Sequence, residues 1–455
     1  MQHEIILSEL ARIFGAKFSA AAAMCESHGQ DEGNHRPAPP DAVLFAESTE
    51  DVAAAVRLCA AHKMPVIAYG AGTSLEGQVT APKGGLSIDL SKMNRVLAVN
   101  SSDMDARVEA GITRIALNRH LRDQGLFMPV DPGADATIGG MIATRASGTN
   151  AVKYGTIREQ LLSLKVVTAT GEIIETGTRA KKSAAGYDLT HLFTGSEGTL
   201  GIITEVSLKL HGIPEQVSAG VCRFPNLEAA INTVISVIQI GMDISRIELL
   251  DALSIKAVNA YSKTNYSEGV TLFLEFTGSK STVGEQVTSF SELAREVGGT
   301  EIEFAANSEE INRLWHARHQ LYYATKALDP EKSCITTDVC VPISRLADCM
   351  LQTRRDLDAS GLAASMLGHV GDGNFHTLVL YDPHGDDVQK VESLSACMAQ
   401  RAIDMGGTCT GEHGIGIGKQ DYLEWERGAS VKLMQQVKNA LDPLGIMNPG
   451  KIFKG

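Results

Sequence analysis

The feature that most constrains the fold of this chain is a glycine-rich loop at the end of a strand–helix–strand unit. Residues 43–45 are expected to form a strand, a helix is expected to begin at residues 48–51, and residues 65–69 form the expected next strand. The loop Gly70–Gln78 then carries three glycines, a threonine and a serine. Closely spaced glycines let backbone N–H groups converge on an anion. The loop therefore predicts a phosphate or pyrophosphate site, with an ordinary tight turn as the alternative.

This loop matches neither of the two common nucleotide-binding fingerprints. The sixth position of a Gly-x-Gly-x-x-Gly dinucleotide motif would be Leu75 here, where glycine or alanine is needed. The Gly-Lys pairs at 418–419 and 450–451 are not followed by the serine or threonine of a P-loop. A Rossmann dinucleotide site and a P-loop are both excluded on these grounds.

Two further segments are rich in small residues. The stretch from Pro129 to Gly155 is expected to be mostly loop, and its part Asp131–Gly148 would let backbone approach a flat ligand closely. A glycine-rich structural loop is the alternative, although long loops inside compact domains are usually functional. The third segment, Gly195–Ile203, enters an expected strand. Residues 162–168 and 172–175, joined by Thr170-Gly171, are expected to form a hairpin. Short strands with few helices up to about Pro214 predict an α+β domain.

The length of 455 residues predicts two or three domains. After about residue 215 the pattern changes to longer alternations of helix and strand with fewer glycines. We expect a first domain over 1–214, an α+β substrate (cap) domain over 215–420, and a C-terminal helical segment over 421–455 that returns to the first domain. A helix is expected at residues 430–441.

Charge and cysteine content exclude several classes of protein. The net charge of −13 argues against nucleic-acid binding, and an acidic surface favours a basic redox partner such as a cytochrome. The eight cysteines form no Cys-x-x-Cys pair, so thiolate zinc sites and iron–sulfur clusters are not expected. No apolar run reaches the ~18 residues of a transmembrane helix. Cytoplasmic residence is the default expectation, with peripheral membrane attachment left open, and mitochondrial residence if a presequence has been removed.

The three glycine-rich segments, in this order and spacing, resemble the FAD-binding domain of the vanillyl-alcohol oxidase / p-cresol methylhydroxylase flavoprotein family. The resemblance covers about residues 37–214 and implies a two-part FAD-binding domain. It implies that the first loop holds the pyrophosphate, that the second runs along the ribityl chain and isoalloxazine, and that the third meets the flavin. Some relatives tether the flavin to histidine or cysteine, which neither Gly70–Gln78 nor Pro132–Gly148 contains, so FAD is expected to be non-covalent. The residues expected to contact FAD are Gly70, Ala71, Gly72, Thr73, Ser74, Gly77, Gln78, Pro132, Gly133, Thr137, Gly140, Ala143, Thr144, Ser147, Gly148, Glu197, Gly201, Ile203 and Asn448.

The second half of the chain contains a histidine pair and a Glu-His pair in glycine-rich surroundings. His369 and His376 are separated by six residues that include a Gly-Asp-Gly turn, and Glu412-His413 follows Gly411. Two imidazoles and a carboxylate could hold one ion and leave coordination positions open, as catalytic metal sites require. The ligand set suits zinc, manganese or iron, and a structural role for the histidines is the alternative.

These residues resemble the C-terminal part of a flavoenzyme group that includes cytochrome-type D-lactate dehydrogenases, D-2-hydroxyglutarate dehydrogenases and glycolate oxidase large subunits. The resemblance implies that His369, His376 and Glu412 bind a divalent metal, zinc or manganese. It also implies that His413 acts as the base and that Asn374 lies by the substrate. Arg318 matches an arginine that pairs with the substrate carboxylate, and on its residue pattern alone it could equally be a surface helix charge.

The expected reaction is oxidation of a small D-2-hydroxy acid to the 2-oxo acid. The substrate would chelate the metal, His413 would remove the hydroxyl proton, and hydride would pass to flavin N5. The segment Thr336–Pro342 lacks the lysine that hydroxyglutarate enzymes use for a distal carboxylate, which favours D-lactate. A D-2-hydroxyglutarate dehydrogenase and a glycolate oxidase FAD subunit are the nearest alternatives. A flavin oxidase and a metal-dependent hydrolase or non-catalytic metal-binding protein are more distant ones. Cytochrome c, a quinone or an electron-transfer flavoprotein would accept the electrons, and the oligomeric state stays open, with a homodimer as one option.

Overall fold

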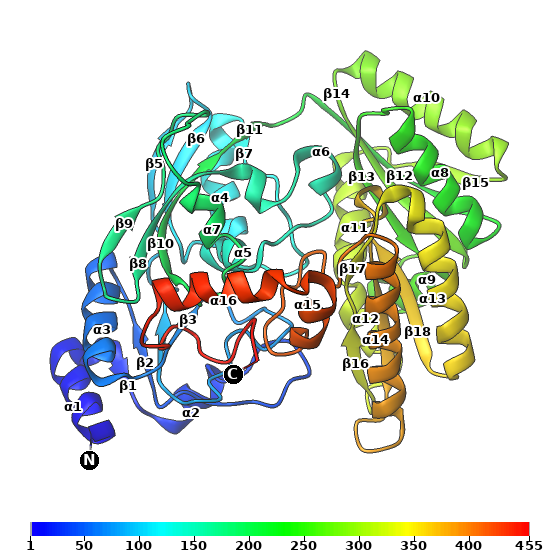
Figure 1. Ribbon diagram of the computed structural model, residues 1–455. Coiled ribbons are helices and arrows are strands. Elements are labelled where there is room, and N and C mark those ends of the chain that lie inside the picture. The colour runs from blue at the N-terminus through cyan, green and yellow to red at the C-terminus, as the bar shows by residue number, and fades with distance from the viewer. Residues whose placement is uncertain (1, 455) are drawn as a thin grey trace. The chain divides into compact units, whose positions relative to one another are not determined.

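The computed structural model describes residues 2–454, which divide into two compact units (Figure 1). Unit 1 comprises the residues up to Ser147, Gly155–Ile213 and the residues from Glu412 onward. Unit 2 comprises Gly148–Tyr154 and Pro214–Gly411. The division at 213–214 falls at the expected boundary. The second unit ends earlier than the expected residue 420 and includes a short earlier segment that sequence patterns did not assign to it.

The first sheet of unit 1 carries the predicted strand–helix–strand unit. Its strand order is β1-β2-β4-β3, with β2, β4 and β3 parallel and β1 antiparallel to β2. The strands are β1 (Phe18–Ser19), β2 (Ala42–Phe45), β4 (Leu86–Asp89) and β3 (Val66–Tyr69). Helix α3 (Thr49–His62) connects β2 to β3, and the Ser48 side chain caps it by accepting from the Asp51 N–H at 3.1 Å. Strand β2, helix α3 and strand β3 form the predicted unit, and the first glycine-rich loop directly follows β3.

The second sheet of unit 1 is antiparallel, with strand order β5-β6-β10-β8-β9. Its strands are β5 (Val96–Asn100), β6 (Asp105–Glu109), β10 (Gly201–Lys209), β8 (Leu161–Thr168) and β9 (Ile173–Glu175). The predicted hairpin is confirmed, because β8 and β9 pair across the turn at Gly171. A small pair joins β7 (Leu126–Phe127) to β11 (His211–Gly212). One hydrophobic core includes buried residues from both larger sheets.

The second glycine-rich segment, from Pro129 to Gly155, is mostly loop as expected, but it contains a helix that the sequence patterns did not predict. Helix α5 (Ile138–Thr144) begins where Thr137 Oγ1 accepts from the Gly140 N–H at 3.2 Å. Its Gly139 lies so close to the sheet that a Cβ there would stand 2.7 Å from the Ala110 Cβ. Small residues therefore serve close helix–sheet packing here. The other helices of unit 1 are α1 (Gln2–Phe14), α2 (Ala22–Ser27), α4 (Arg114–Leu121), α7 (Leu189–Phe193), α15 (Gln420–Arg427), α16 (Ser430–Leu441) and the 3₁₀ turns η1 (Gly15–Lys17), η2 (Arg122–Gln124) and η3 (Ile157–Gln160).

Unit 2 is built on one antiparallel sheet with strand order β15-β12-β14-β13-β18-β19-β16, and β17 also pairs with β19. Its strands are β12 (Gln216–Phe224), β13 (Ile244–Leu250), β14 (Val270–Gly278), β15 (Thr300–Phe304), β16 (Ser333–Thr336), β17 (Val339–Cys340), β18 (Ala363–Gly368) and β19 (Asn374–Tyr381). Alternate residues of β14 enter two separate cores: Leu272 and Leu274 pack in one, and Phe273 packs in the other. Both faces of this sheet are therefore covered.

Two groups of helices cover the two faces of this sheet, and Figure 1 shows α8 and α10 beside β12 and β15. The first group, which shares a core with Leu272 and Leu274, is α8 (Leu227–Gln239), α10 (Lys280–Glu296), α13 (Leu346–Ser360) and α14 (Asp387–Asp404). The second group, which shares a core with Phe273, is α9 (Ala252–Ser262), α11 (Ser308–His319) and α12 (Leu321–Lys326). Short elements complete the unit: α6 (Ala151–Tyr154), η4 (Ile343–Arg345) and η5 (Val370–Asp372). Among residues 2–454, no helix combines the length and the apolar character needed to cross a membrane.

Candidate active site

The three glycine-rich segments of unit 1 meet one another. A Cβ on Gly70, directly after β3, would stand 2.4 Å from Thr137 Oγ1, so the first loop touches the start of α5. The backbone N–H of Gly195 donates to the Ile142 carbonyl at 2.9 Å, and that of Glu197 donates to the Ala143 carbonyl at 2.9 Å. Segments that lie far apart in the sequence are thus brought to one place, as a single cofactor site requires.

The first loop has backbone donors available for an anion. The N–H groups of Ala71, Gly72 and Thr73 make no hydrogen bond to another residue within the described range 2–454. Gly72 has φ +71°, a left-handed conformation that favours glycine. Consecutive N–H groups in such a turn form an anion-binding concavity. The loop therefore fits a pyrophosphate.

Two of the residues expected to contact FAD, Ser74 and Gly77, also contact a carboxylate that sequence patterns did not single out. Asp31 Oδ2 accepts from the Ser74 hydroxyl at 2.9 Å and from the Gly77 N–H at 2.8 Å. Burial raises the pKa of Asp31 above its usual range. Asp31 of the N-terminal segment thus holds the end of the loop at Ser74 and Gly77. The backbone N–H groups nearer β3 stay available for an anion.

Asn448 joins the first and third segments. Its Nδ2 group donates to the Gln78 carbonyl at 3.0 Å and to the Glu197 carbonyl at 2.7 Å, and the residue is buried. Its φ of +40° is left-handed, a conformation that asparagine adopts more readily than most residues. The predicted cofactor residues Gln78, Glu197 and Asn448 therefore contact one another.

The side chain of Glu197 fixes the loop that carries His413. Its Oε1 accepts from the Ile415 N–H at 2.7 Å, and its Oε2 accepts from the Gly416 N–H at 2.8 Å. Gln78 Nε2 donates to the His413 carbonyl at 2.8 Å. Burial raises the pKa of Glu197 to about 7. The backbone around the predicted base is thus held by Gln78 and Glu197, two of the residues predicted to contact FAD.

The remaining predicted FAD residues belong to unit 1, except Gly148, which begins the short unit 2 segment. Thr144 Oγ1 donates within α5 to the Gly140 carbonyl at 3.2 Å. Ser147, Gly201 and Ile203 are buried. Pro132 is partly buried, whereas Gly133 is exposed and has open space where a Cβ would stand. These positions stay predictions as cofactor contacts.

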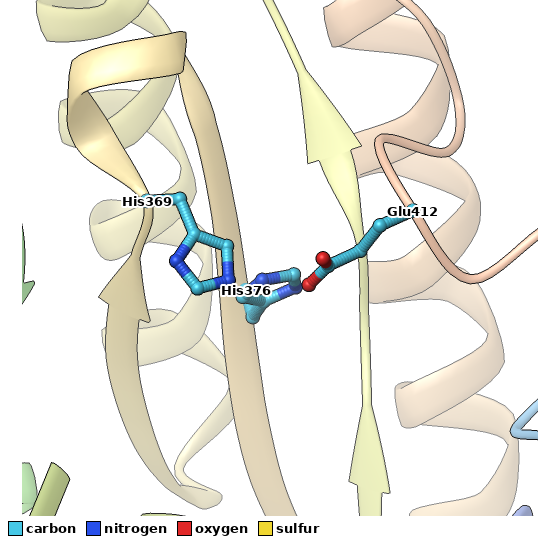
Figure 2. Close-up of side chains that lie close together, drawn as sticks. All are labelled: His369, His376 and Glu412. Atoms are coloured by element: carbon cyan, nitrogen blue, oxygen red, sulfur yellow. The ribbon is translucent and has the colours of Figure 1, made fainter. Parts of the chain in front are cut away.

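The predicted metal ligands come together. His369 follows β18, and His376 lies on β19; their ring centroids are 5.5 Å apart with the ring planes at 82°. Glu412 directly follows Gly411, the last residue of unit 2. One ligand atom from each of the three residues lies within 4.8 Å of the others, and Figure 2 shows the two rings and the carboxylate directed toward one another. Two imidazoles and one carboxylate fit a divalent transition-metal ion such as zinc or manganese.

The segment before Glu412 is anchored in unit 2, which explains how a distant carboxylate reaches the histidines. Thr408 and Cys340 exchange backbone hydrogen bonds of 2.8 and 3.2 Å. The Thr410 hydroxyl donates to Asp338 Oδ2 at 2.8 Å. A side chain at Gly411 would place its Cβ 2.2 Å from Asn374 Nδ2, so only glycine fits this close approach.

Both histidines have Nδ1 engaged by an oxygen acceptor. His369 Nδ1 lies 2.7 Å from Glu248 Oε1, and His376 Nδ1 lies 3.0 Å from the Thr337 carbonyl oxygen. Both contacts favour the tautomer with the proton on Nδ1, which leaves Nε2 as the nitrogen that would coordinate. Burial alone would raise the pKa of Glu248, but His369 and Arg318 outweigh it, and the pKa lies below its ordinary value.

Arg318 is buried, so the alternative of a surface helix charge is wrong. It lies on α11 and is 6% exposed. Its Nε and Nη2 donate to Glu248 Oε2 at 3.0 and 2.6 Å. Its Nη1 group donates to no other residue in the described part of the chain. That outer edge of the guanidinium could pair with a substrate carboxylate.

Asn374 begins β19 and is buried beside the histidines. Its Nδ2 donates to Asp338 Oδ1 at 2.8 Å and to the Val339 carbonyl at 2.7 Å. Its Oδ1 is buried and accepts no hydrogen bond from the residues that the structure describes. A buried oxygen without a donor has a cost, which a substrate hydroxyl or a water could remove.

Sequence reasoning missed Glu248 and Asp338. Glu248 lies in β13 between Ile247 and Leu249, both fully buried. A carboxylate between two buried apolar residues of a mostly apolar strand was the available signal. Asp338 holds both Asn374 and Thr410, and lies 3.6 Å from His376 Nδ1. The signal here was a carboxylate in an otherwise neutral segment, Thr336–Pro342.

Known proteins resemble this chain over nearly its whole length. A probable mitochondrial D-lactate dehydrogenase of Danio rerio is 47% identical over 99% of this chain and 92% of its own. A mitochondrial D-lactate dehydrogenase of the cytochrome type from Arabidopsis thaliana is 44% identical over 94% of this chain and 76% of its own. A crystal structure of p-cresol methylhydroxylase with bound substrate superposes with a TM-score of 0.80 at 16% identity, over 100% of this chain and 97% of its own. The last likeness supports the fold alone.

Two family models also match the chain. The model for an FAD binding domain matches residues 40–177, and the model for the C-terminal domain of FAD-linked oxidases matches residues 213–452. The resemblance to p-cresol methylhydroxylase-type flavoproteins is thus confirmed, as is the prediction of an FAD-binding domain followed by a cap domain. The chain is a flavoprotein oxidoreductase and belongs to the FAD-linked oxidase family.

Proposed function

We propose that this protein is an FAD- and metal-dependent dehydrogenase that oxidises D-lactate to pyruvate. The observation that carries the proposal is the convergence of His369, His376 and Glu412. The guanidinium of Arg318 lies nearby, because the Glu248 carboxylate bonds to both Arg318 and His369. A cation and a guanidinium held at a fixed separation suit a small acid with adjacent hydroxyl and carboxylate groups. The names of the relatives from Danio rerio and Arabidopsis thaliana support D-lactate as the substrate.

The side chains have separate tasks in the proposed reaction. His369, His376 and Glu412 would hold zinc or manganese, and the flavin segments of unit 1 would hold FAD without a covalent bond. When bound, the cation lowers the pKa of the substrate hydroxyl and FAD accepts hydride at N5. Arg318 would bind and orient the substrate carboxylate. Asn374 Oδ1 would accept a hydrogen bond from the substrate, since it is buried and lacks a donor among the described residues.

His413 would take the proton from the substrate hydroxyl as general base. Imidazole titrates near neutral pH, so it can accept a proton and release it afterwards. Its backbone carbonyl is held by Gln78, and the following residues are held by Glu197. These contacts limit the positions that the imidazole can take, which is what positioning of a catalytic group requires.

The proposed electron acceptor is a cytochrome, and the proposed location is the mitochondrion. The relatives from Danio rerio and Arabidopsis thaliana are named as mitochondrial, and the one from Arabidopsis thaliana is also named for cytochrome. The net charge of −13 suits an acceptor with a basic face. Cytochrome c, a quinone analogue and an electron-transfer flavoprotein are the acceptors to compare in a steady-state assay.

Anaerobic flavin reduction tests this function directly. The purified holoenzyme would be mixed with D-lactate, L-lactate, glycolate or D-2-hydroxyglutarate, and the flavin absorbance near 450 nm would be followed. Rapid bleaching with D-lactate, and slow or no bleaching with the others, is the expected result. Preference for glycolate or D-2-hydroxyglutarate would reject D-lactate as the substrate, and a protein that purifies without flavin would reject the whole proposal.

A further inference from the structure

Glu248 is a deeply buried carboxylate next to the candidate metal ligands, with a side chain that is 1% exposed. It lies on β13, opposite Phe273 of β14. Phe273 packs in the core that includes α11, so Glu248 points to the same face of the sheet as Arg318 on that helix. A buried carboxylate in such a place must be satisfied by strong donors.

The two oxygens of Glu248 serve two different residues. Oε1 lies 2.7 Å from His369 Nδ1, whereas Oε2 accepts from Nε and Nη2 of Arg318 at 3.0 and 2.6 Å. One carboxylate therefore connects a candidate metal ligand to a candidate substrate-binding guanidinium. Because a carboxylate is planar and rigid, it sets the separation and relative orientation of the two groups.

We propose that Glu248 is a positioning residue for both binding groups of the site. As an acceptor, its carboxylate keeps the His369 proton on Nδ1 and directs Nε2 toward the cation. By occupying the inner edge of the Arg318 guanidinium, it leaves the outer edge for the substrate carboxylate. This inference rests on the proposed function, in which His369 binds a metal and Arg318 binds a 2-hydroxy acid.

Glu275 provides a matched control. It lies on β14, beside Arg246 of β13, and is also buried. It accepts from Trp315 Nε1 at 2.6 Å and pairs with Arg246 at 3.6 Å. Arg246 also stacks over the Trp315 ring at 4.6 Å. Replacing Glu275 therefore removes a buried carboxylate from the same sheet while the Glu248–His369 contact stays in place.

The test is a titration of metal-free, FAD-loaded holoenzyme with Mn²⁺, followed by the electron paramagnetic resonance signal of free Mn²⁺. Wild type is expected to bind one ion per chain. Glu248→Gln is expected to weaken Mn²⁺ binding roughly 10–100-fold, as loss of a carboxylate behind a histidine ligand typically does. Glu275→Gln is expected to bind like wild type. The d–d absorption bands of Co²⁺-loaded protein should shift in Glu248→Gln and stay unchanged in Glu275→Gln.

A second measurement on wild type covers the case in which Glu248→Gln does not fold. Nitrogen NMR of histidine-labelled, metal-free protein, with the His369 signals assigned by His369→Gln, should find the proton on Nδ1. A proton on Nε2, or unchanged Mn²⁺ affinity and Co²⁺ bands in folded Glu248→Gln, would overturn the role of Glu248 alone. Failure of wild type to bind any of these ions would overturn the metal part of the proposed function as well.

Discussion

His369 Nδ1 lies 2.7 Å from Glu248 Oε1, and the other oxygen of the same carboxylate accepts hydrogen bonds from Arg318. The site in unit 2 is therefore organised by a residue that would touch neither cation nor substrate. A histidine ligand oriented by a carboxylate binds metal more tightly and in a defined direction. A guanidinium with one edge already bound loses less freedom when its other edge binds an anion.

Replacement of His413 should separate catalysis from binding. His413→Ala is expected to retain FAD and metal but to slow flavin reduction by D-lactate by roughly 10²–10⁴-fold, the usual contribution of general base catalysis. Stopped-flow reduction at several pH values would measure it, and the variant should also lose the rise in rate with pH that titration of a base produces. Near-normal reduction would remove the assignment of His413 as the base.

Even a conservative replacement of Arg318 should lower the catalytic efficiency with D-lactate. Arg318→Lys keeps the charge but loses one of the two contacts with Glu248, so the outer donor edge is no longer fixed. Loss of one charge-assisted hydrogen bond costs about 1.5–3 kcal/mol, and kcat/KM for D-lactate should fall roughly 10–100-fold, mainly through KM. Arg318→Met leaves the Glu248 charge buried and should destabilise unit 2 by about 3–5 kcal/mol. Wild-type kinetics in Arg318→Lys would contradict a role in carboxylate binding.

Asn448 should affect flavin binding through two hydrogen bonds. Asn448→Ala loses the contacts with the Gln78 and Glu197 carbonyls, each worth about 1 kcal/mol, and must also adopt φ +40°. FAD dissociation, measured by flavin fluorescence on dilution, is expected to become faster. Asn448→Gly is the control, because glycine accepts this backbone conformation but lacks the amide. If both variants retain FAD as well as wild type does, the two hydrogen bonds do not support the cofactor site.

Glu197 should make stability depend on pH. Burial raises its pKa in the folded protein from the ordinary 4.5 to about 7, so the folded state holds the proton more tightly than the unfolded state does. Its contribution is fully present below pH 4.5 and is lost as the pH rises through 7. At about 1.4 kcal/mol per pH unit, the loss over this shift is at most about 3.5 kcal/mol. Melting temperatures from pH 5 to 8 should fall more steeply for wild type than for Glu197→Gln, and equal slopes would contradict the prediction.

Local patterns predicted the elements that depend on local residues. The Ser48 cap, the hairpin at Gly171 and the C-terminal helix Ser430–Leu441 are confirmed by the structure. The flavin-binding fold was predicted from three spaced segments. Their glycines are recognisable in the sequence because the backbone conformation and the close approach of neighbouring segments require them. Helix α5 was missed, because small residues that favour loops also allow tight helix packing, as Gly139 does against Ala110.

The candidate site could be predicted only in part. His369, His376 and Glu412 stand out because their residue types have metal chemistry, and the structure brings them together, although metal binding itself stays a prediction. Glu248 could not be placed in the same way, since its partners lie 121 and 70 residues away along the chain. Asp31, which reaches Ser74 and Gly77, was hidden for the same reason. Contacts between distant residues leave no periodic signal in one sequence.

The most direct test of the account is flavin reduction by D-lactate before and after metal removal. Holoenzyme would be treated with a chelator, checked for retained FAD by absorbance and for lost metal by mass spectrometry, and mixed anaerobically with D-lactate in a stopped-flow instrument. Reduction is expected nearly to stop in the metal-free, FAD-loaded protein and to return when Zn²⁺ or Mn²⁺ is added back in a stoichiometric amount. Unchanged reduction in metal-free protein would contradict it.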